Sequence, residues 1–327
     1  MVGKGRERLS VAIVSGGLSH ERDVSIRSGS RVSYALEDAG HDVMVVDFDA
    51  RGLDAISANR PDVIVNMLHG GIGEDGTAQS LLELFGIPLV GAPAAAARFA
   101  FDKACASEML KREGLAVPDS LVISASVLRE LGSGGMLKRL SGRLRLPLVV
   151  KPRRGGSALG VAVVRETSEF LPALVSALRY DDSVLVQEYV YGREFAVGVV
   201  DGRSGPRCFT PIEVVVPNGV LFDYAQRYTA ELVDARICMD LEGVDVSILE
   251  SAAIGAFQSL GLRHFSRVDL IVRQDGVPVV LEAAIHPGMT ETSLWPLAAK
   301  HSGLDFSEVW SSLIFDAVGS GDRSGTG

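Results

Sequence analysis

Cysteine is scarce in this 327-residue chain, and its three copies lie far apart. Cys105, Cys208 and Cys238 are odd in number and form no CxxC pair. This spacing indicates neither a disulfide framework nor a zinc site of the usual kind. The cysteine content therefore favours a protein of the reducing cytoplasm.

Long hydrophobic runs are also missing, since no stretch approaches the roughly 18–20 apolar residues of a membrane-spanning helix. The first ten residues, MVGKGRERLS, are charged and lack the apolar core of a signal peptide. We therefore expect no membrane association. The C-terminal stretch GSGDRSGTG is small and polar, which predicts a disordered tail after about residue 317.

An excess of positive charge is missing too, because 41 acidic residues outnumber 32 basic ones and the net charge is −9. Binding to a nucleic-acid backbone needs a basic surface, so nucleic acid is excluded as the main partner. An anionic small ligand could still bind at a local basic site. The chain is long enough for two or three domains of ordinary globular composition.

Apolar runs alternate with helical spacing over the first 95 residues. We expect strands at 10–15, 41–48 and 61–68, and helices at 22–39 and 77–85. Such alternation predicts a parallel sheet with helices on both faces.

A different pattern follows, opening with an amphipathic helix at 101–114 and including a glycine-rich and basic connector at 131–145 that we expect to be mobile. The pattern there is typical of an α+β arrangement. The expected strands are 119–123, 147–151, 160–165, 183–190, 193–200, 208–216, 264–273 and 277–284, and the expected helices are 167–179, 243–260, 293–301 and 305–316.

A glycine-rich loop joins two strands in PLVVKPRRGGSALGVAVV, residues 147–164. Glycine lets backbone N–H groups approach phosphate oxygens, and Lys151, Arg153 and Arg154 would add positive charge. No GK[ST] follows, so this is not a Walker A loop. Taken alone, the stretch fits a phosphate lid and a flexible hairpin about equally.

Two polar loops follow neighbouring strands at the edge of a parallel sheet where ligands usually bind. The first contains Glu21, and the second contains His69, Glu74 and Asp75. Glu21 could instead complement the dipole of the helix that begins there, and His69 could be structural or solvated. Two such loops at one edge raise the expectation of a site.

Carboxylates also occur on two strands near the C-terminus. Arg267 and Asp269 share one face of a strand, and Glu282 shares a face with Ala284 and His286 on the next. Buried carboxylates are costly unless they bind a cation or an arginine. Asp269 and Glu282 therefore suit Mg²⁺, and the alternative is a structural pair with Arg267.

Eight stretches in this order resemble the D-alanine:D-alanine ligases of the ATP-grasp superfamily, and the resemblance covers residues from about 10 to 316. Any one stretch alone would be weak. The stretches are GGLSHERDVSIRSG, LHGGIGEDGTAQSLLELFGIPLVGA, FDK, VVKPRRGGSALGV, VQEYVYGREFAVGV, FDYAQRY, RVDL and HPGMTETSLWP.

The resemblance implies an α/β and α+β fold of three domains: a Rossmann-like N-terminal domain (1–95), a central domain with the lid (96–185) and a C-terminal domain (186–327). ATP would bind between the second and third domains, and the family suggests a homodimer. The matching nucleotide-binding residues are Lys103, Lys151, Gly156, Gln187, Glu188, Val190, Glu194 and Arg227. Arg227 stands where the family usually has lysine.

For two D-amino acid substrates, the resemblance implies that Glu21 receives the first amino group, with His69 beside it. Tyr228 and Ser157 would join Glu21 in a hydrogen-bonded clasp. The other matching positions are Arg267 and the Gly288 backbone for developing negative charge, Ser293 and Leu294 for the second carboxylate, and Asp269 and Glu282 for Mg²⁺, with Mn²⁺ as a substitute.

The implied reaction transfers the γ-phosphoryl group of ATP to the carboxylate of the first substrate. The amine of the second substrate then attacks this acyl phosphate, and phosphate leaves. Cations must screen the two anions that react first, and water must be excluded from the acyl phosphate. A mobile lid is therefore expected.

The chain departs from the family at Ala284, where the family has an asparagine that binds a second metal ion. Water could fill the position, His286 could substitute, or the second metal site could be weakened. We favour water, because Mg²⁺ retains waters and prefers oxygen ligands, and we expect His286 to be a turn residue before Pro287. Ala158 replaces a serine of the family's lid.

These departures leave two classes of function open. The chain could be a working ligase that makes D-alanyl-D-alanine or a related product, including one specialised for biosynthesis or self-resistance. It could instead be a degenerate homologue that binds nucleotide with little turnover. The sequence favours a ligase, because the expected site residues are present: Glu21, Lys103, Lys151, Arg267, Asp269 and Glu282.

Overall fold

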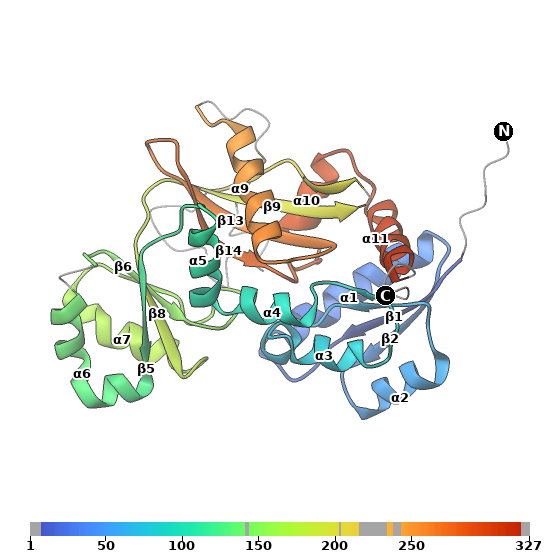
Figure 1. Cartoon of the computed structure of the whole chain (residues 1–327), viewed down its shortest axis with the longest axis horizontal. Coiled ribbons are helices and arrows are strands. Elements are labelled where there is room, and N and C mark those ends of the chain that lie inside the picture. The colour runs from blue at the N-terminus through green and yellow to red at the C-terminus, as the bar shows by residue number, and fades with distance from the viewer. Residues whose placement is uncertain (1–7, 141–143, 203, 216–233, 238–242, 322–327) are drawn as a thin grey trace.

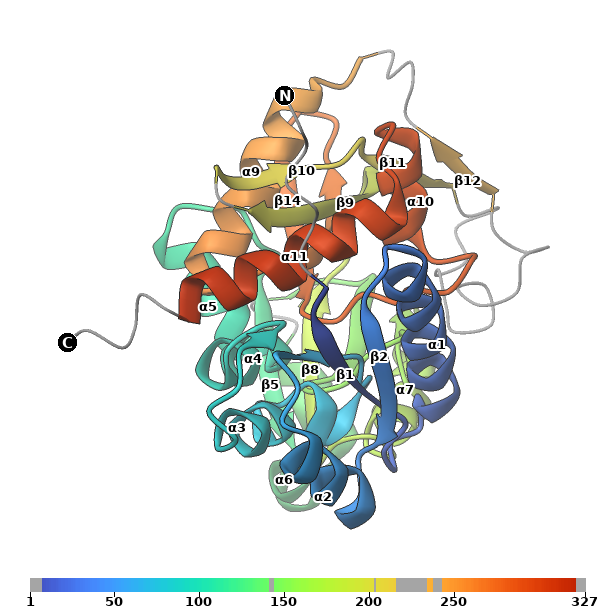
Figure 2. The same ribbon diagram turned by 90° about the vertical axis from the view of Figure 1, so that its right-hand side faces the viewer.

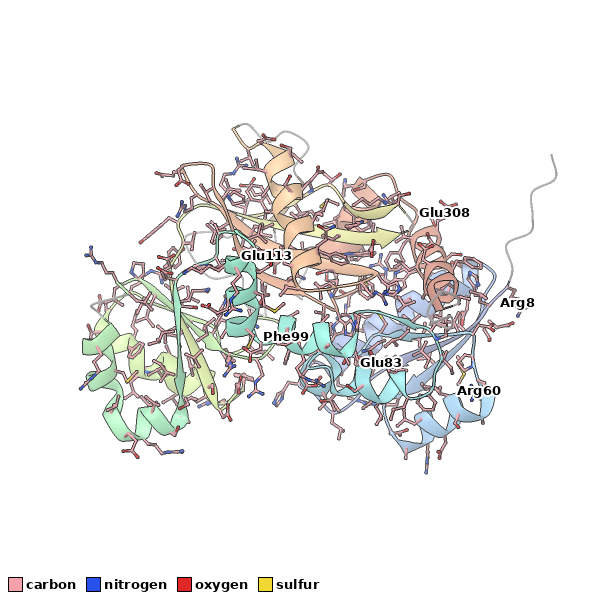
Figure 3. All side chains as sticks on the ribbon, viewed as in Figure 1. Arg8, Arg60, Glu83, Phe99, Glu113 and Glu308 are labelled. Atoms are coloured by element: carbon pink, nitrogen blue, oxygen red, sulfur yellow. The ribbon has the colours of Figure 1, made fainter. Side chains whose placement is uncertain are left out.

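The structure is a computed structural model of the whole chain. It describes residues 8–140, 144–202, 204–215, 234–237 and 243–321. These described residues form three sheets, each with covering helices (Figure 1). Side chains fill the space between the sheets and their helices (Figure 3).

The first sheet is parallel, as predicted, with the strand order β2-β1-β3-β4. Alternate residues of its apolar strands share one face of the sheet, and four of them are buried in one hydrophobic core: Val11, Ile13, Val63 and Val65. The prediction overlooked α2, because this helix is short and few of its residues are buried. The elements of this region are β1 (Ser10–Ser15), α1 (Arg22–Asp38), β2 (Asp42–Asp47), α2 (Ala50–Asn59), β3 (Val63–Asn66), α3 (Thr77–Glu83) and β4 (Leu89–Val90).

The central sheet is antiparallel, with the order β5-β8-β6-β7, and it lies at the left of Figure 1 with α6 and α7 beside it. The expected connector at 131–145 is wrong over residues 131–140, because α6 runs through them to Leu140. Gly132 has non-helical dihedral angles, so a glycine kinks this helix. The elements are β5 (Ser120–Ser124), α6 (Ala125–Leu140), β6 (Leu148–Pro152), β7 (Ala162–Val164), α7 (Thr167–Ala177) and β8 (Ser183–Glu188).

The third sheet has the order β12-β11-β9-β13-β14, and β10 pairs with β9. The predicted end of the last helix is wrong, since α11 continues to Gly321, beyond the residue at which we expected the tail to begin. The strands are β9 (Arg193–Gly202), β10 (Gly205–Cys208), β11 (Ile212–Val215), β12 (Asp234–Ile237), β13 (Phe265–Val272) and β14 (Pro278–Ala284). The helices are α4 (Ala94–Phe101), α5 (Lys103–Arg112), α9 (Val246–Ser259), α10 (Leu294–His301) and α11 (Phe306–Gly321).

One hydrophobic core joins the first and third sheets. Val11 and Val65 of the first sheet belong to the same buried cluster as Phe265, Trp295 and Trp310. The rings of Phe265 and Trp310 meet edge to face with centroids 5.2 Å apart. Helix α11 crosses between the two sheets, as Figure 2 shows. This packing holds the loops of the first sheet in a fixed position beside β13 and β14.

No helix in the described part of the chain is both long enough and apolar enough to span a membrane.

Candidate active site

The loops after β1 and β3 meet at the carboxyl edge of the first sheet, as predicted. The Ser19 hydroxyl donates to the backbone oxygen of His69 at 2.5 Å. The same hydroxyl accepts a hydrogen bond from the backbone N–H of Glu21 at 3.1 Å. One serine therefore places Glu21 and His69 next to each other.

Glu21 is buried and accepts a hydrogen bond from the Ser157 hydroxyl of the glycine-rich loop. Its side chain makes no capping bond to α1 and is instead hydrogen-bonded to the glycine-rich loop. Gly70 has a φ angle of 67°, which favours glycine, and a Cβ atom there would lie 2.3 Å from Glu21 Oε2. Burial raises the pKa of Glu21, the Glu74 carboxylate raises it further, and the bond from Ser157 opposes both effects.

The glycine-rich loop has an uncommon backbone at the point where it reaches Glu21. Ser157 and Ala158 have φ angles of 50° and 55°, in the left-handed region that residues with a Cβ atom rarely adopt. This conformation brings the Ser157 hydroxyl to Glu21, while Ala158 lines a neighbouring cavity. The loop therefore contacts the residues that follow the first strand of the first sheet.

A small pocket of about 60 Å³ lies beside Glu21. His69, Glu74, Arg267 and Gly288 also line it, and His69 Nδ1 is 3.7 Å from Glu74 Oε1. Sequence reasoning noted Glu74 without assigning it to a site. Its neighbour Asp75 instead accepts a hydrogen bond from the Thr77 backbone N–H at the start of α3.

A larger cavity of about 380 Å³ lies between the central and third sheets. Every residue predicted to bind nucleotide lines it, apart from Arg227, which lies outside the described residues together with Tyr228. The lining residues of this predicted set are Lys103, Lys151, Gly156, Gln187, Glu188, Val190 and Glu194. Lys103, Gly155, Gly156 and Glu282 line both cavities, so the two adjoin.

Lys103 supplies positive charge at the junction of the two cavities. Its Nζ donates to the Gly155 backbone oxygen at 2.5 Å and lies 3.6 Å from Glu282 Oε2. Asp102 caps α5 by accepting from Ala104 N and Cys105 N, which fixes Lys103 at the first helical position. Lys151 is a second, buried lysine on β6.

Arg153 and Arg154 do not supply charge to this cavity, which corrects the prediction. Arg153 Nη2 lies 2.7 Å from Asp102 Oδ2, and Arg154 Nη2 lies 3.1 Å from Asp181 Oδ1. Both guanidinium groups are therefore neutralised by carboxylates of the central region. Sequence spacing cannot show this, because Asp102 is remote from Arg153 along the chain.

Asp269 and Glu282 lie directly opposite each other on β13 and β14, next to an irregularity in the strand register. Arg267 donates two hydrogen bonds of 2.7 Å to Asp269, so the arginine pair considered from the sequence is present. Both carboxylates also line the larger cavity. Their hard oxygen atoms suit Mg²⁺, which takes its remaining ligands from water and phosphate.

Comparison with known proteins decides the family. A family model for the D-ala D-ala ligase C-terminus matches residues 109–315, and one for the N-terminus matches residues 51–92. The chain belongs to the D-alanine:D-alanine ligase family. It is 35% identical to the D-alanine–D-alanine ligase of Moorella thermoacetica, over 94% of this chain and 98% of that protein.

Solved structures of this family have the same fold. The VanG D-Ala:D-Ser ligase from Enterococcus faecalis is 27% identical, with a TM-score of 0.78 over 95% of this chain and all of that one. The D-alanine–D-alanine ligase from Bacillus anthracis, solved in complex with ATP, is 25% identical, with a TM-score of 0.77 over 97% of this chain and all of that one. The predicted family and fold class are therefore confirmed.

The stretch after β14 carries Gly288, which the family resemblance assigns to developing negative charge, and Ser293 and Leu294, which it assigns to the carboxylate of the second substrate. Gly288 lines the small pocket, whereas Ser293 and Leu294 at the start of α10 line neither cavity. Ser293 Oγ accepts from the Thr290 backbone N–H at 3.0 Å. Arg31 of α1 donates to the Met289 backbone oxygen at 3.1 Å, so α1 helps to hold this loop.

His286 lies in the bend before Pro287, but it is not a simple turn residue. Its ring is buried, and Nδ1 is 3.0 Å from the Leu68 backbone oxygen. Burial lowers the pKa of His286 to about 4. The ring also stacks on Phe265 with centroids 6.1 Å apart. His286 therefore connects the loops after β3 and β14 in this family member.

Proposed function

We propose that this chain is an ATP-dependent ligase that joins D-alanine to D-alanine or to another D-amino acid and releases ADP and phosphate. The observation that carries the proposal is the shared wall of the two cavities. The residues expected to bind a nucleotide line the larger cavity, and Glu21 and His69, which are expected to bind the first amino acid, line the smaller one beside it. The names of the relatives and of the ATP complex support the same activity.

In this proposal the nucleotide lies between the central and third sheets. The segment from Gln187 to Val190 faces the adenine ring, and Glu194 binds the ribose. Lys103 and Lys151 contact the phosphate groups. The phosphate oxygens also accept hydrogen bonds from backbone N–H groups near Gly156. The support is that all these residues line one cavity.

Asp269 and Glu282 would hold Mg²⁺, or Mn²⁺ in its place, where the phosphate groups of ATP enter the junction of the cavities. The metal ion would neutralise phosphate charge during the transfer. Arg267 already neutralises Asp269, so the arginine would turn toward the reacting carboxylate once the metal ion takes its place. Glu282 faces both cavities and is placed to act where they meet.

The first D-amino acid would bind in the small pocket with its ammonium group toward Glu21 and Glu74. A buried carboxylate without a cation is unfavourable, and the raised pKa of Glu21 expresses that cost. His69, Arg267 and the Gly288 backbone surround the carboxylate that accepts the phosphoryl group. Ser157 joins Glu21 to the lid, and Tyr228 would complete the clasp.

The second step forms the peptide bond. The uncharged amine of the second substrate attacks the acyl carbon, the bond from that carbon to the phosphate oxygen breaks, and phosphate leaves. The amine proton passes to solvent or phosphate. Because both substrates are already bound in the reactive orientation, the reaction step does not have to supply the translational and rotational entropy of bringing them together. The glycine-rich loop, when closed, excludes water that would otherwise hydrolyse the acyl phosphate.

Ser293 and Leu294 would bind the carboxylate of the second substrate and thereby influence its identity. One structural relative is a D-Ala:D-Ser ligase, which supports a second substrate other than D-alanine as an alternative. A panel of D-amino and D-hydroxy acids offered with D-alanine and ATP tests the assignment. ATP binding without phosphate release for every pair would support the degenerate homologue instead.

We further infer a cytoplasmic homodimer, on the basis of the family alone. Light scattering coupled to gel filtration would give twice the 34.7 kDa mass of the chain if this is right. A mass equal to one chain would contradict it.

A further inference from the structure

Ser28 is a fully buried serine of α1 that the reaction described above does not use. Its Oγ lies 3.2 Å from His69 Nε2 and accepts a hydrogen bond from the Met289 backbone N–H at 3.0 Å. His69 belongs to the loop after β3, and Met289 belongs to the loop after β14. One hydroxyl therefore bridges the two loops from which His69 and Gly288 line the small pocket.

The bridge favours one of the two neutral tautomers of the His69 ring. With the Met289 N–H as its donor, the Ser28 hydroxyl has one hydrogen to give, and His69 Nε2 is its partner in the described part of the chain. A neutral ring that accepts at Nε2 carries its hydrogen on Nδ1. That N–H then faces Glu74 Oε1, 3.7 Å away.

The other tautomer is unfavourable for two reasons. It would direct the Nδ1 lone pair at the Glu74 carboxylate, which also carries negative charge density. It would also turn Nε2 into a donor and leave the buried Ser28 hydrogen without an acceptor, at the cost of an unmade hydrogen bond.

We propose that Ser28 is a positioning residue that keeps the hydrogen of His69 on Nδ1 and fixes the Gly288–Met289 peptide at the same time. The role in catalysis rests on the proposed function, in which His69 and Gly288 flank the carboxylate of the first substrate. Through one hydroxyl, the first domain sets both the polarity of His69 and the spacing between the two sides of the pocket.

The ring nitrogen shifts of His69 test the tautomer in the ligand-free protein. The full chain is labelled with nitrogen-15 histidine, and His69→Gln identifies the His69 signals among those of the six histidines. We expect a protonated Nδ1 and an unprotonated Nε2 in the natural protein, and a partial shift toward protonated Nε2 in Ser28→Ala, because the Glu74 carboxylate still lies near Nδ1. A protonated Nε2 in the natural protein, or unchanged shifts in Ser28→Ala, would overturn the proposal.

Ser25→Ala is the matched control. Ser25 is also fully buried on α1, and its hydroxyl donates to the Met67 oxygen at 2.7 Å and accepts from Gly16 N at 2.8 Å. The Ser25→Ala variant loses the same kind of hydrogen bonds, but the bridge from Ser28 to His69 is unchanged. The His69 shifts should therefore stay as in the natural protein, and Ser28→Thr, which retains the hydroxyl, should preserve them too.

Kinetics separate this inference from the proposed function. Ser28→Ala should lower kcat about tenfold while the KM for ATP stays within about twofold, since one hydrogen bond to the reacting centre is lost. An equal loss of kcat in Ser25→Ala would overturn the catalytic part. If the natural protein forms no product at all, the proposed function fails, and the nitrogen shifts still decide whether Ser28 sets the tautomer.

Discussion

Ser157 donates a hydrogen bond to Glu21 across 136 positions of the chain. The serine belongs to the glycine-rich loop of the central region, and the glutamate follows the first strand of the N-terminal sheet. Through Gly155, Gly156 and Ser157 this loop also lines the small pocket. The bond therefore joins the loop that we propose as the lid to the group that we assign to the amino end of the first substrate.

Ser157→Ala should lower kcat/KM for D-alanine by about tenfold to a hundredfold, because a hydrogen bond to a charged group is lost. Steady-state phosphate release measures the effect. Ser126→Ala removes an exposed hydroxyl of α6 that bonds Ser124 at 2.8 Å, and it should change neither rate nor affinity. Equal activity of Ser157→Ala and the natural protein would contradict a role for the clasp.

Glu21→Gln should make the protein more stable at neutral pH and abolish activity. The pKa of Glu21 is raised in the fold, so the folded state binds its proton more tightly than the unfolded state does. Stability attached to this group is therefore present at low pH and is lost as pH rises from the ordinary value of about 4.3 through the raised value. Thermal unfolding from pH 3.5 to 7.5 measures the difference between the two proteins.

Asp47→Asn is the opposite control for that experiment. Hydrogen bonds from Arg22 are the main cause that lowers the pKa of Asp47 to about 2. This carboxylate therefore contributes stability above its ordinary pKa, which is lost as pH falls toward 2. Glu21→Gln and Asp47→Asn should shift the melting temperature in opposite directions at pH 7. A lower melting temperature for Glu21→Gln would contradict the account of its burial.

Glu282→Gln should weaken binding of magnesium-loaded ATP far more than binding of ATP in EDTA, because one of two oxygen ligands loses its charge. Isothermal titration calorimetry gives both affinities. Glu213→Gln is the matched variant, since Glu213 lines the same cavity but is paired with Arg193 at 2.6 Å. An equal effect of the two substitutions on the magnesium dependence would contradict the metal assignment.

Ala284→Asn should leave the rate of dipeptide formation equal or raise it, because an amide oxygen would replace a water at the second metal position. The measurement is the rate as a function of magnesium concentration. A large loss of activity would mean that the site is built around the methyl group of Ala284.

His286→Gln should remove part of the acid sensitivity of the fold. The pKa of His286 is about 4 in the folded state, so the unfolded state binds a proton more readily. Stability is therefore lost as pH falls from about 6.5 to about 4, by roughly 3 kcal/mol. Urea unfolding across this range should show a flatter profile for the variant. Loss of metal affinity in the variant would show instead that His286 is a ligand.

Much of the fold could be predicted from residue patterns, because strands β1, β3 and β13 are apolar runs with clear ends. Helix α2 was overlooked because it has few buried positions, Gly52 and Ile56. The glycines near 131–145 read as a connector, whereas one of them kinks α6. The backbone dihedral angles of these glycines decide whether the segment is a connector or a kinked helix, and these angles cannot be predicted from the sequence.

Residues at the two cavities were predicted where a motif or strand end marks them, as at Glu21, Lys151 and Glu282. Pairings across the fold could not be predicted. Arg153 lies close to Lys151 in the sequence, yet its charge is paired with that of Asp102. Ser28 carries no motif signal of its own, and its role appears when two distant loops meet at one hydroxyl.

The acyl phosphate is the centre of this account, and oxygen-18 tests it most directly. D-alanine labelled with oxygen-18 in its carboxylate is incubated with ATP, magnesium and the protein, and the released phosphate is analysed by mass spectrometry. We predict one labelled oxygen in each phosphate, with one dipeptide formed for each ADP. Unlabelled phosphate, or no phosphate release despite ATP binding, would contradict the account.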